Sequence, residues 1–228
     1  FRCEDRISET LSFAELYNQV SKTAQHLREL GVTKGDRVAG FLPNFAGSIV
    51  AMLATASVGA IWSSCSPDFG EQGVIDRFGQ IEPKVLFCVD GYFYNGKSHN
   101  CLSKIKSFST RLPTLKQVVI FDYASVDRIS IDNSISYQGI LDNYEPNEID
   151  FERVGFDHPL YIMYSSGTTG VPKCIVHGHG GTLVQHLKEH QLQTNISVGD
   201  RVFYFTTCSW MMWNWLVSAL GTGASIML

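Results

Sequence analysis

The chain has 228 residues, of which 44% are hydrophobic and 18% charged, a balance that excludes a disordered or fibrous protein. The formal net charge is −4 and no local cluster of Lys and Arg offsets it, so we expect no nucleic-acid partner. The six cysteines form no C-x-x-C pair, and most lie in apolar runs. They are therefore expected to be reduced, buried thiols in a cytosolic protein.

The first half of the chain alternates helices with apolar strands. Ser12 and Glu15 have the spacing of a capping box, and apolar residues at helical intervals then predict a helix over 13–30. Asn44 is the expected cap of a second, largely apolar helix that ends before Gly59. Two further helices are expected at 71–80 and 102–108, and strands at 37–42, 60–64, 84–90 and 117–121. Near-continuous apolar strands between helices predict a parallel sheet covered on both faces.

The second half begins with a polar stretch and then resumes the alternation. Residues 124–157 carry several turn signals, and we interpret them either as a segment that connects a first α/β portion, 1–123, to the start of a second, 158–228, or as a long surface excursion. In this second portion we expect strands at 160–164, 174–177, 201–205 and 224–228, and helices at 183–193 and 211–220. The uncharged stretch after Arg201 contains no helical piece near the roughly 20 residues that cross a membrane. The predicted fold class is α/β, with largely parallel sheets flanked by helices.

A loop rich in hydroxyl groups and glycine joins the strands expected at 160–164 and 174–177. Its sequence is Ser165-Ser166-Gly167-Thr168-Thr169-Gly170-Val171-Pro172-Lys173. Glycines let backbone N–H groups approach an anion, hydroxyl groups donate further hydrogen bonds, and the lysine adds a positive charge. The Walker pattern G-x-x-x-x-G-K-[ST] is not matched, because Pro172 precedes the lysine and Cys174 follows it. The composition predicts a phosphate-binding loop, with an ordinary surface turn as the alternative.

This loop resembles the phosphate-binding signature of the adenylate-forming enzymes, which include acyl-CoA synthetases, luciferases and peptide-synthetase adenylation domains. The resemblance implies that the loop holds the β- and γ-phosphates of ATP while a carboxylate attacks the α-phosphorus. The residues that would hold these phosphates are Ser165, Ser166, Gly167, Thr168, Thr169, Gly170 and Lys173. The resemblance also implies Mg²⁺ on the phosphate oxygens, coenzyme A as the accepting thiol, and a place in the large N-terminal domain of such an enzyme.

An aromatic and sulfur-rich run follows later in the chain. Its residues are Trp210, Met211, Met212, Trp213 and Asn214. The run offers a large apolar surface together with indole N–H groups and a side-chain amide. Packing of a helix against the core is one interpretation, and the family resemblance implies the other, a wall of the acyl pocket.

Several stretches are similar to the branch of the family that activates acetoacetate. They are 61–70, 173–177, 180–190 and 210–215. A β-keto acid needs a hydrogen-bond donor in its pocket, and Asn214 or an indole N–H could supply it. A synthetase for another short-chain acid is the alternative within the family. A non-catalytic, truncated nucleotide-binding module is the alternative outside it.

One lysine is a candidate contact for coenzyme A. Lys97 matches in kind a cation that contacts the phosphates of coenzyme A in similar enzymes, and a solvent-exposed surface lysine is the alternative. The adenylation lysine, the metal-binding Glu and the ribose-binding Asp of the family belong to its second half. We therefore assign no catalytic residue and no metal ligand within this chain. Because the chain starts without Met and ends inside an expected strand, we expect a fragment. Since the resemblance implies that the catalytic groups belong to the second half, we expect this fragment to be inactive alone.

A competing motif lies in the helix expected at 183–193. His186-Leu187-Lys188-Glu189-His190 matches the H-x-x-E-H string of inverted zinc peptidases. Two histidines four residues apart share a helix face, as zinc ligation requires, but the site still needs a third protein ligand. Asp200 is the only carboxylate that follows. A solvated helix face is the alternative.

Overall fold

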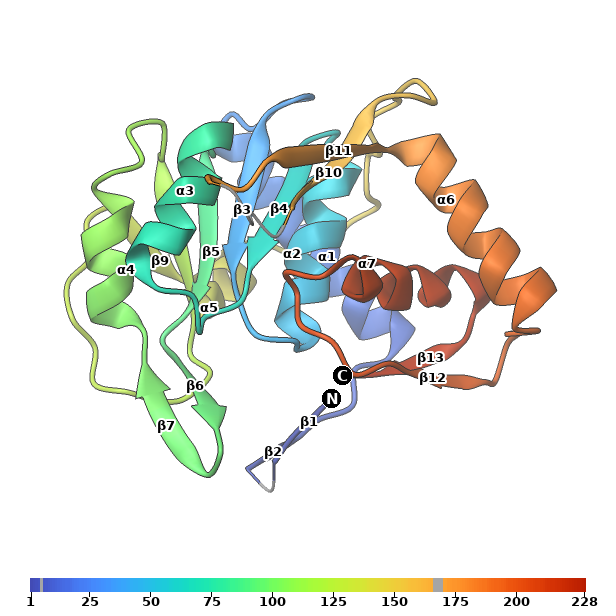
Figure 1. Cartoon of the computed structure of the whole chain (residues 1–228), viewed down its shortest axis with the longest axis horizontal. Helices are drawn as coiled ribbons and strands as arrows, with labels where there is room; N and C mark the ends of the chain where they lie inside the picture. The colour runs from blue at the N-terminus through green and yellow to red at the C-terminus, as the bar shows by residue number, and fades with distance from the viewer. Residues whose placement is uncertain (5, 166–169) are drawn as a thin grey trace.

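The structure is a computed structural model, and it describes residues 1–4, 6–165 and 170–228. Its centre is a seven-stranded sheet with the strand order β11-β10-β4-β3-β5-β8-β9 (Figure 1). The strands are β3 (Arg37–Phe41), β4 (Ile61–Cys65), β5 (Val85–Val89), β8 (Gln117–Phe121), β9 (Ser134–Ser136), β10 (Pro159–Tyr164) and β11 (Cys174–Gly178). Neighbouring strands pair in parallel, except that β10 and β11 form an antiparallel hairpin.

Helices cover both faces of this sheet. Apolar residues of α1 (Phe13–Glu29), α2 (Ala46–Ser57) and α5 (Tyr137–Asn143) share one core with the sheet. Those of α3 (Glu71–Ile81) and α4 (Leu102–Ser109) share a second core. Strand β5 shows the reason for its unbroken apolar sequence, because Val85 and Phe87 face the first core while Leu86 and Cys88 face the second. The predicted fold class, a largely parallel sheet covered on both faces, is confirmed.

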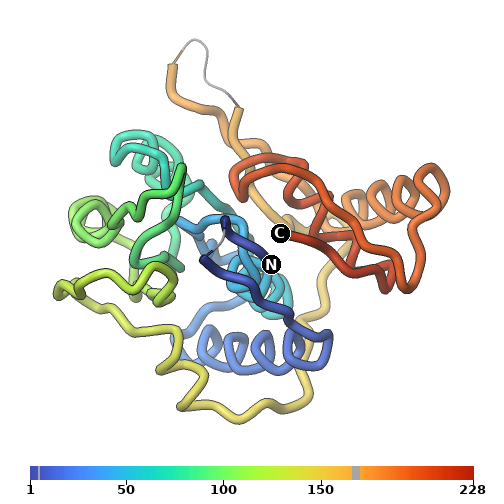
Figure 2. The backbone as a smooth tube through the Cα atoms, turned by 90° about the horizontal axis from the view of Figure 1, so that it is seen from below, coloured from blue at the N-terminus to red at the C-terminus, as the bar shows by residue number. Residues whose placement is uncertain are grey.

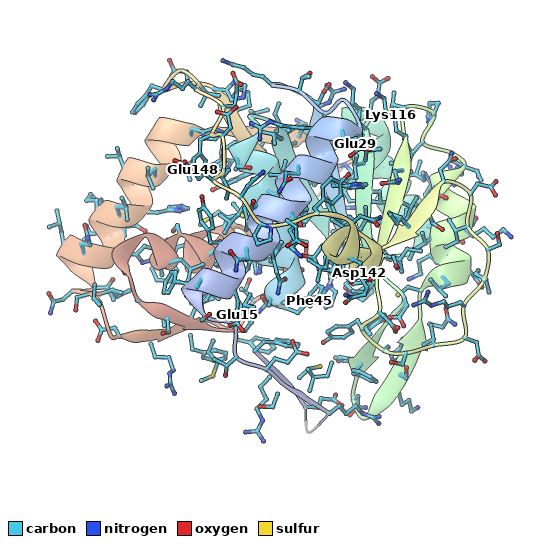
Figure 3. The ribbon with its side chains drawn as sticks, turned by 180° about the vertical axis from the view of Figure 1, so that it is seen from behind. Glu15, Glu29, Phe45, Lys116, Asp142 and Glu148 are labelled. Atoms are coloured by element: carbon cyan, nitrogen blue, oxygen red, sulfur yellow. The ribbon has the colours of Figure 1, made fainter. Side chains whose placement is uncertain are left out.

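The two predicted helix starts have different outcomes. The capping box of α1 is confirmed, since the Glu15 N–H donates to the Ser12 hydroxyl and the Ser12 N–H donates to the Glu15 carboxylate. Seen from behind, α1 lies in front of the sheet with Glu15 and Glu29 toward its two ends (Figure 3). The prediction that Asn44 caps α2 is wrong: Phe45 precedes the helix without a side-chain cap. The Asn44 side chain instead accepts a hydrogen bond from the buried indole of Trp213 at 2.8 Å.

The polar segment 124–157 packs on the seven-stranded sheet and on helix α1. It contributes β9 and α5, and its later part follows α1, where Gln25 donates to the Glu145 carbonyl at 2.8 Å and Tyr17 accepts from the Ile149 N–H at 2.9 Å. Strands β10 and β11 extend this same sheet, and separate pairing starts with β12 (Arg201–Phe203) and β13 (Ser225–Met227), which are parallel to each other. The domain boundaries expected from the sequence remain a prediction.

Two small ribbons and two helical regions complete the described chain. They are β1 (Arg2–Cys3) with β2 (Ile7–Ser8), β6 (Gly91–Tyr94) with β7 (Lys97–Asn100), α6 (His179–Leu187) continued by the π-helix Lys188–Gln193, and α7 (Met211–Ser218) continued by the 3₁₀-helix Ala219–Thr222. The two ends of the chain lie beside each other (Figure 2), and the Arg2 N–H donates to the Leu228 carbonyl at 3.1 Å. Within the described ranges, every helix is too short or too polar to cross a lipid bilayer.

Candidate nucleotide and acid site

The predicted phosphate loop, 165–173, and the segment leading to the predicted acid-pocket run, 210–214, lie at the same edge of the sheet. Strands β3, β4 and β10 run in parallel, and in open α/β sheets the carboxyl ends of the strands are where ligands bind. Strand β10 leads from this edge into the phosphate loop. The segment that precedes α7 packs against the same edge, because the Ser64 hydroxyl donates to the Cys208 carbonyl at 2.6 Å and the Cys208 thiol donates to the Pro43 carbonyl at 3.0 Å.

The phosphate loop is closed at its base by its first and last residues. The Ser165 N–H donates to the Lys173 carbonyl and the Lys173 N–H donates to the Ser165 hydroxyl, each at 3.0 Å. These bonds continue the β10–β11 pairing one step beyond Tyr164 and Cys174. Gly170 has φ +144°, a backbone conformation that glycine adopts without strain. Of the predicted phosphate-binding residues, Ser166, Gly167, Thr168 and Thr169 lie outside the described residues.

Helix α3 supports one limb of the loop. Gln80 donates to the Pro172 carbonyl at 2.8 Å, and the Cys174 thiol lies 3.7 Å from the Gln80 amide oxygen. The guanidinium of Arg77, one turn earlier on α3, lies 5.7 Å from the ring centre of Tyr164. Neither α3 residue stands out in the sequence, because their spacing along the helix resembles that of a solvated face.

The five predicted acid-pocket residues do not share one surface. Trp210 and Met211 are 67% and 42% exposed, Met212 is half-buried, and Trp213 and Asn214 are buried. The division follows from the start of α7 at Met211, since successive helical residues point in different directions. The indole N–H of Trp213 already has Asn44 as its acceptor. The donors that remain for a β-keto oxygen are the Trp210 indole and the Asn214 amide.

A small cavity lies between β4, β10 and α7. It is lined by Trp62, Ser64, Tyr161, Ile162, Met163, Cys208, Ser209 and Asn214. Three buried polar atoms among these residues have no hydrogen-bond partner within the described part of the chain: Trp62 Nε1, the Tyr161 hydroxyl and Asn214 Oδ1. Burial raises the pKa of Tyr161 to about 12, so this phenol is protonated at neutral pH.

The candidate coenzyme A contact stands on a separate hairpin. Lys97 is exposed on β7, and β6 follows the carboxyl end of β5, so the hairpin extends from the same edge of the sheet (Figure 1). The buried carboxylate of Asp90 anchors the hairpin by accepting the Gly91 N–H at 2.8 Å and the Val126 N–H at 3.0 Å. The Arg6 guanidinium lies 4.9 Å from the ring centre of Phe93 on the other strand.

The comparison with known families decides the kind of protein. A family model described as AMP-binding enzyme matches residues 3–228. The chain belongs to the AMP-binding enzyme family. The predicted phosphate loop, the predicted acid-pocket residues 210–214 and the Lys97 hairpin therefore all lie within the residues that this family model matches.

Individual AMP-binding enzymes resemble the chain over nearly its whole length. An acetoacetyl-coenzyme A synthetase from Rhizobium meliloti (strain 1021) is 52% identical over 230 residues, covering 100% of this chain and 35% of the relative. A malonamoyl-CoA synthetase, vrtB, from Penicillium aethiopicum is 44% identical, covering 96% and 31%. The solved structure of acetoacetyl-CoA synthetase from Streptomyces lividans matches with a TM-score of 0.91 and 47% identity, covering 96% and 33%. The chain thus spans about a third of the length of the relatives that it matches.

The H-x-x-E-H string at 186–190 takes part in packing between helices. No group of three His, Cys, Asp or Glu side chains in the described ranges could hold a metal ion. His190 Nε2 instead lies 2.9 Å from the Ser218 hydroxyl, and Glu189 accepts the Trp215 indole N–H at 2.9 Å. These contacts join α6 and its π-helical end to α7. The alternative of a solvated face is also wrong for the two histidines, because His186 and His190 are buried.

Proposed function

We propose that the full-length protein carrying this chain is an AMP-forming ligase that converts acetoacetate to acetoacetyl-CoA in the cytosol. The observation that supports this most is the 52% identity, over the whole chain, to a protein named acetoacetyl-coenzyme A synthetase. In the first step an acid oxygen attacks the α-phosphorus of ATP and pyrophosphate leaves. In the second, the sulfur of coenzyme A attacks the acyl carbon and AMP leaves.

The chain's part in the first step is to hold ATP. Ser165 and Lys173 fix the base of a loop whose backbone N–H groups and hydroxyls would bind the β- and γ-phosphates. The exposed Lys173 side chain would offset their negative charge. Mg²⁺ prefers phosphate and water oxygens to a cage of protein ligands, and the described residues offer no such cage. We therefore assign Mg²⁺ to the nucleotide phosphates.

The acid would lie against the wall formed by the start of α7. The acids of an acetoacetyl- and of a malonamoyl-CoA synthetase share a second carbonyl at the same distance from the carboxylate. A donor that recognises this carbonyl would fit both relatives. Our candidates for it are the exposed Trp210 indole at the start of α7 and the Asn214 amide, which is buried in the first turn of that helix. A pocket with such a donor disfavours butyrate, because butyrate leaves the donor unpaired.

Lys97 is our proposed contact for the phosphates of coenzyme A. Its hairpin is fixed to the sheet by Asp90, so the ammonium group has a defined base from which to reach a ligand at this edge. A contact of this kind would act in the thiol step and not in adenylation.

Product analysis of the full-length protein tests the proposed function. We expect acetoacetyl-CoA and AMP to form from acetoacetate, ATP and coenzyme A, with slower reaction of acetate, propionate and butyrate. Asn214→Ala should reduce the preference for acetoacetate over butyrate, whereas Asn18→Ala, at an exposed position of α1, should leave it unchanged. ATP binding without any acid-dependent AMP formation would instead support a non-catalytic nucleotide-binding module.

A further inference from the structure

The cavity between β4, β10 and α7 brings together three buried polar side chains. Trp62 and Tyr161 are register partners on neighbouring parallel strands, and Asn214 lies in the first turn of α7. Their residues are only 1%, 2% and 4% exposed, respectively. Each has a buried polar atom without a hydrogen-bond partner in the described ranges, and burying such an atom is unfavourable. All three residues line the same cavity.

The donor and acceptor chemistry of the three atoms fits one small molecule. The Trp62 indole can only donate, Asn214 Oδ1 can only accept, and the Tyr161 hydroxyl can do either. A water molecule can accept from the indole, donate to the amide oxygen and share a third bond with the phenol. The cavity has room for about one water, and buried waters typically make about three such bonds.

We propose that Trp62, Tyr161 and Asn214 bind one ordered water molecule that joins the start of α7 to the sheet. Trp62 and Tyr161 then act as positioning residues for the acid wall, because Met211 and Met212 stand in the turn that this water anchors. Among the described residues, the Asn214 amide nitrogen donates only to the Met163 sulfur, 3.8 Å away, so the water would be the main group that orients the amide. The part concerning the acid rests on the proposed function, and the water site itself does not.

Removal of the Tyr161 hydroxyl should change the unfolding midpoint in opposite directions, depending on whether the cavity holds a water or is empty. If a water is bound, Tyr161→Phe deletes one of its three partners and lowers the unfolding midpoint of the full-length protein by about 2 °C. If the cavity is dry, the same change removes an unpaired buried hydroxyl and raises the midpoint or leaves it unchanged. Both comparisons are made in a Thr182→Val background, because the Thr182 hydroxyl is near enough to the phenol to bond it directly. Tyr161→Phe keeps the ring, which packs 5.1 Å from the His177 ring, so the comparison isolates the hydroxyl.

Tyr137→Phe is the matched control. Tyr137 is also buried, but its hydroxyl already donates to Gln19 at 3.2 Å, and it lies on α5 beside α1. We expect both variants to lose stability and only Tyr161→Phe to reduce the acetoacetate-over-butyrate preference, by about threefold or more. Asn214→Leu provides a second variant. The double variant with Tyr161→Phe should lose less stability than the sum of the losses in the two single variants, because both changes act through the same water.

A crystal structure of the full-length protein supplies the direct observation. A water within hydrogen-bond distance of all three polar atoms supports the proposal. A higher or unchanged unfolding midpoint in Tyr161→Phe, or additive effects with Asn214→Leu, overturns the water site. A lower midpoint with an unchanged acid preference overturns the positioning role. Failure of the wild-type protein to use acetoacetate would overturn the proposed function, while the midpoint and the crystal structure would still decide on the water.

Discussion

Ser165 and Lys173, eight residues apart, bond to each other twice: the Ser165 N–H donates to the Lys173 carbonyl, and the Lys173 N–H donates to the Ser165 hydroxyl. The second bond uses an oxygen lone pair of the hydroxyl and leaves its O–H free to donate to an anion. The loop between these residues therefore starts from a fixed base on the edge hairpin of the sheet. In this arrangement Ser165 fixes the base of the loop.

Ser165→Ala should weaken ATP binding in the full-length protein. The change removes the side-chain bond but keeps the backbone bond, and one lost hydrogen bond costs about 1 kcal/mol, or roughly fivefold in affinity. We expect the KM for ATP in pyrophosphate exchange to rise by about this factor. Ser130→Ala, at an exposed position of the segment that follows β8, is the control. Equal KM values for the two variants would contradict the role of Ser165.

The bond from Trp213 to Asn44 should stabilise the attachment of α7 to the sheet. Trp213→Phe leaves the Asn44 amide oxygen without its donor, and Asn44→Ala leaves the Trp213 indole N–H without its acceptor. Each change should therefore lower stability. In a double-mutant cycle measured by urea unfolding, we expect a coupling energy of about 1 kcal/mol. Additive losses would show that the two residues do not stabilise each other.

Lys97→Ala should affect only the second half-reaction. We expect the KM for coenzyme A to rise about fivefold, as for loss of one solvent-exposed ionic contact, and ATP–pyrophosphate exchange to stay unchanged. Lys106→Ala, an exposed lysine on α4, provides the control. An unaltered KM for coenzyme A in Lys97→Ala would remove this residue from the site.

The histidine pair beneath α7 should make stability depend on pH. Burial lowers the pKa of His186 and of His190, and the neighbouring His190 lowers the pKa of His186 further. The Glu189 carboxylate opposes both shifts but does not outweigh burial. The unfolded chain therefore binds more protons below its ordinary histidine pKa of about 6.5. Stability is fully present above that pH and is lost as pH falls toward the lower pKa of the folded state.

Unfolding midpoints at pH 7.5 and 5.5 measure this loss. His186→Gln should reduce the difference between the two midpoints, because the variant has no imidazole to protonate at that position. His26, whose pKa burial also lowers, contributes equally to both proteins and cancels in the comparison. A variant that loses as much stability as the wild type would show that His186 is not one of the groups responsible.

The sequence predicted the central sheet well because local pattern and tertiary position agree there. Unbroken apolar strands need two covered faces, and the residues of β5 alternate between two cores. The hairpin of β6 and β7 was missed although Asn95-Gly96, with φ +51° and +73°, is a typical two-residue turn signal.

The candidate site was only partly predictable. Ser165 and Lys173 were identified within the loop, but support by Gln80 arises from a contact 92 residues away, which no local pattern encodes. Asn44 has the spacing of a helix cap, yet its side chain serves a tryptophan 169 residues further along the chain. Trp62 and Tyr161 look like ordinary strand residues until the topology places them side by side.

The most direct test of the proposed function is acid-dependent ATP–pyrophosphate exchange by the full-length protein in the absence of coenzyme A. This reaction isolates the step for which the phosphate loop and the acid wall would be responsible. We expect exchange that requires acetoacetate and exceeds the rate with butyrate by about tenfold or more, the effect of one recognised polar group. Exchange that is equal for the two acids, or absent with acetoacetate, would contradict the proposed function.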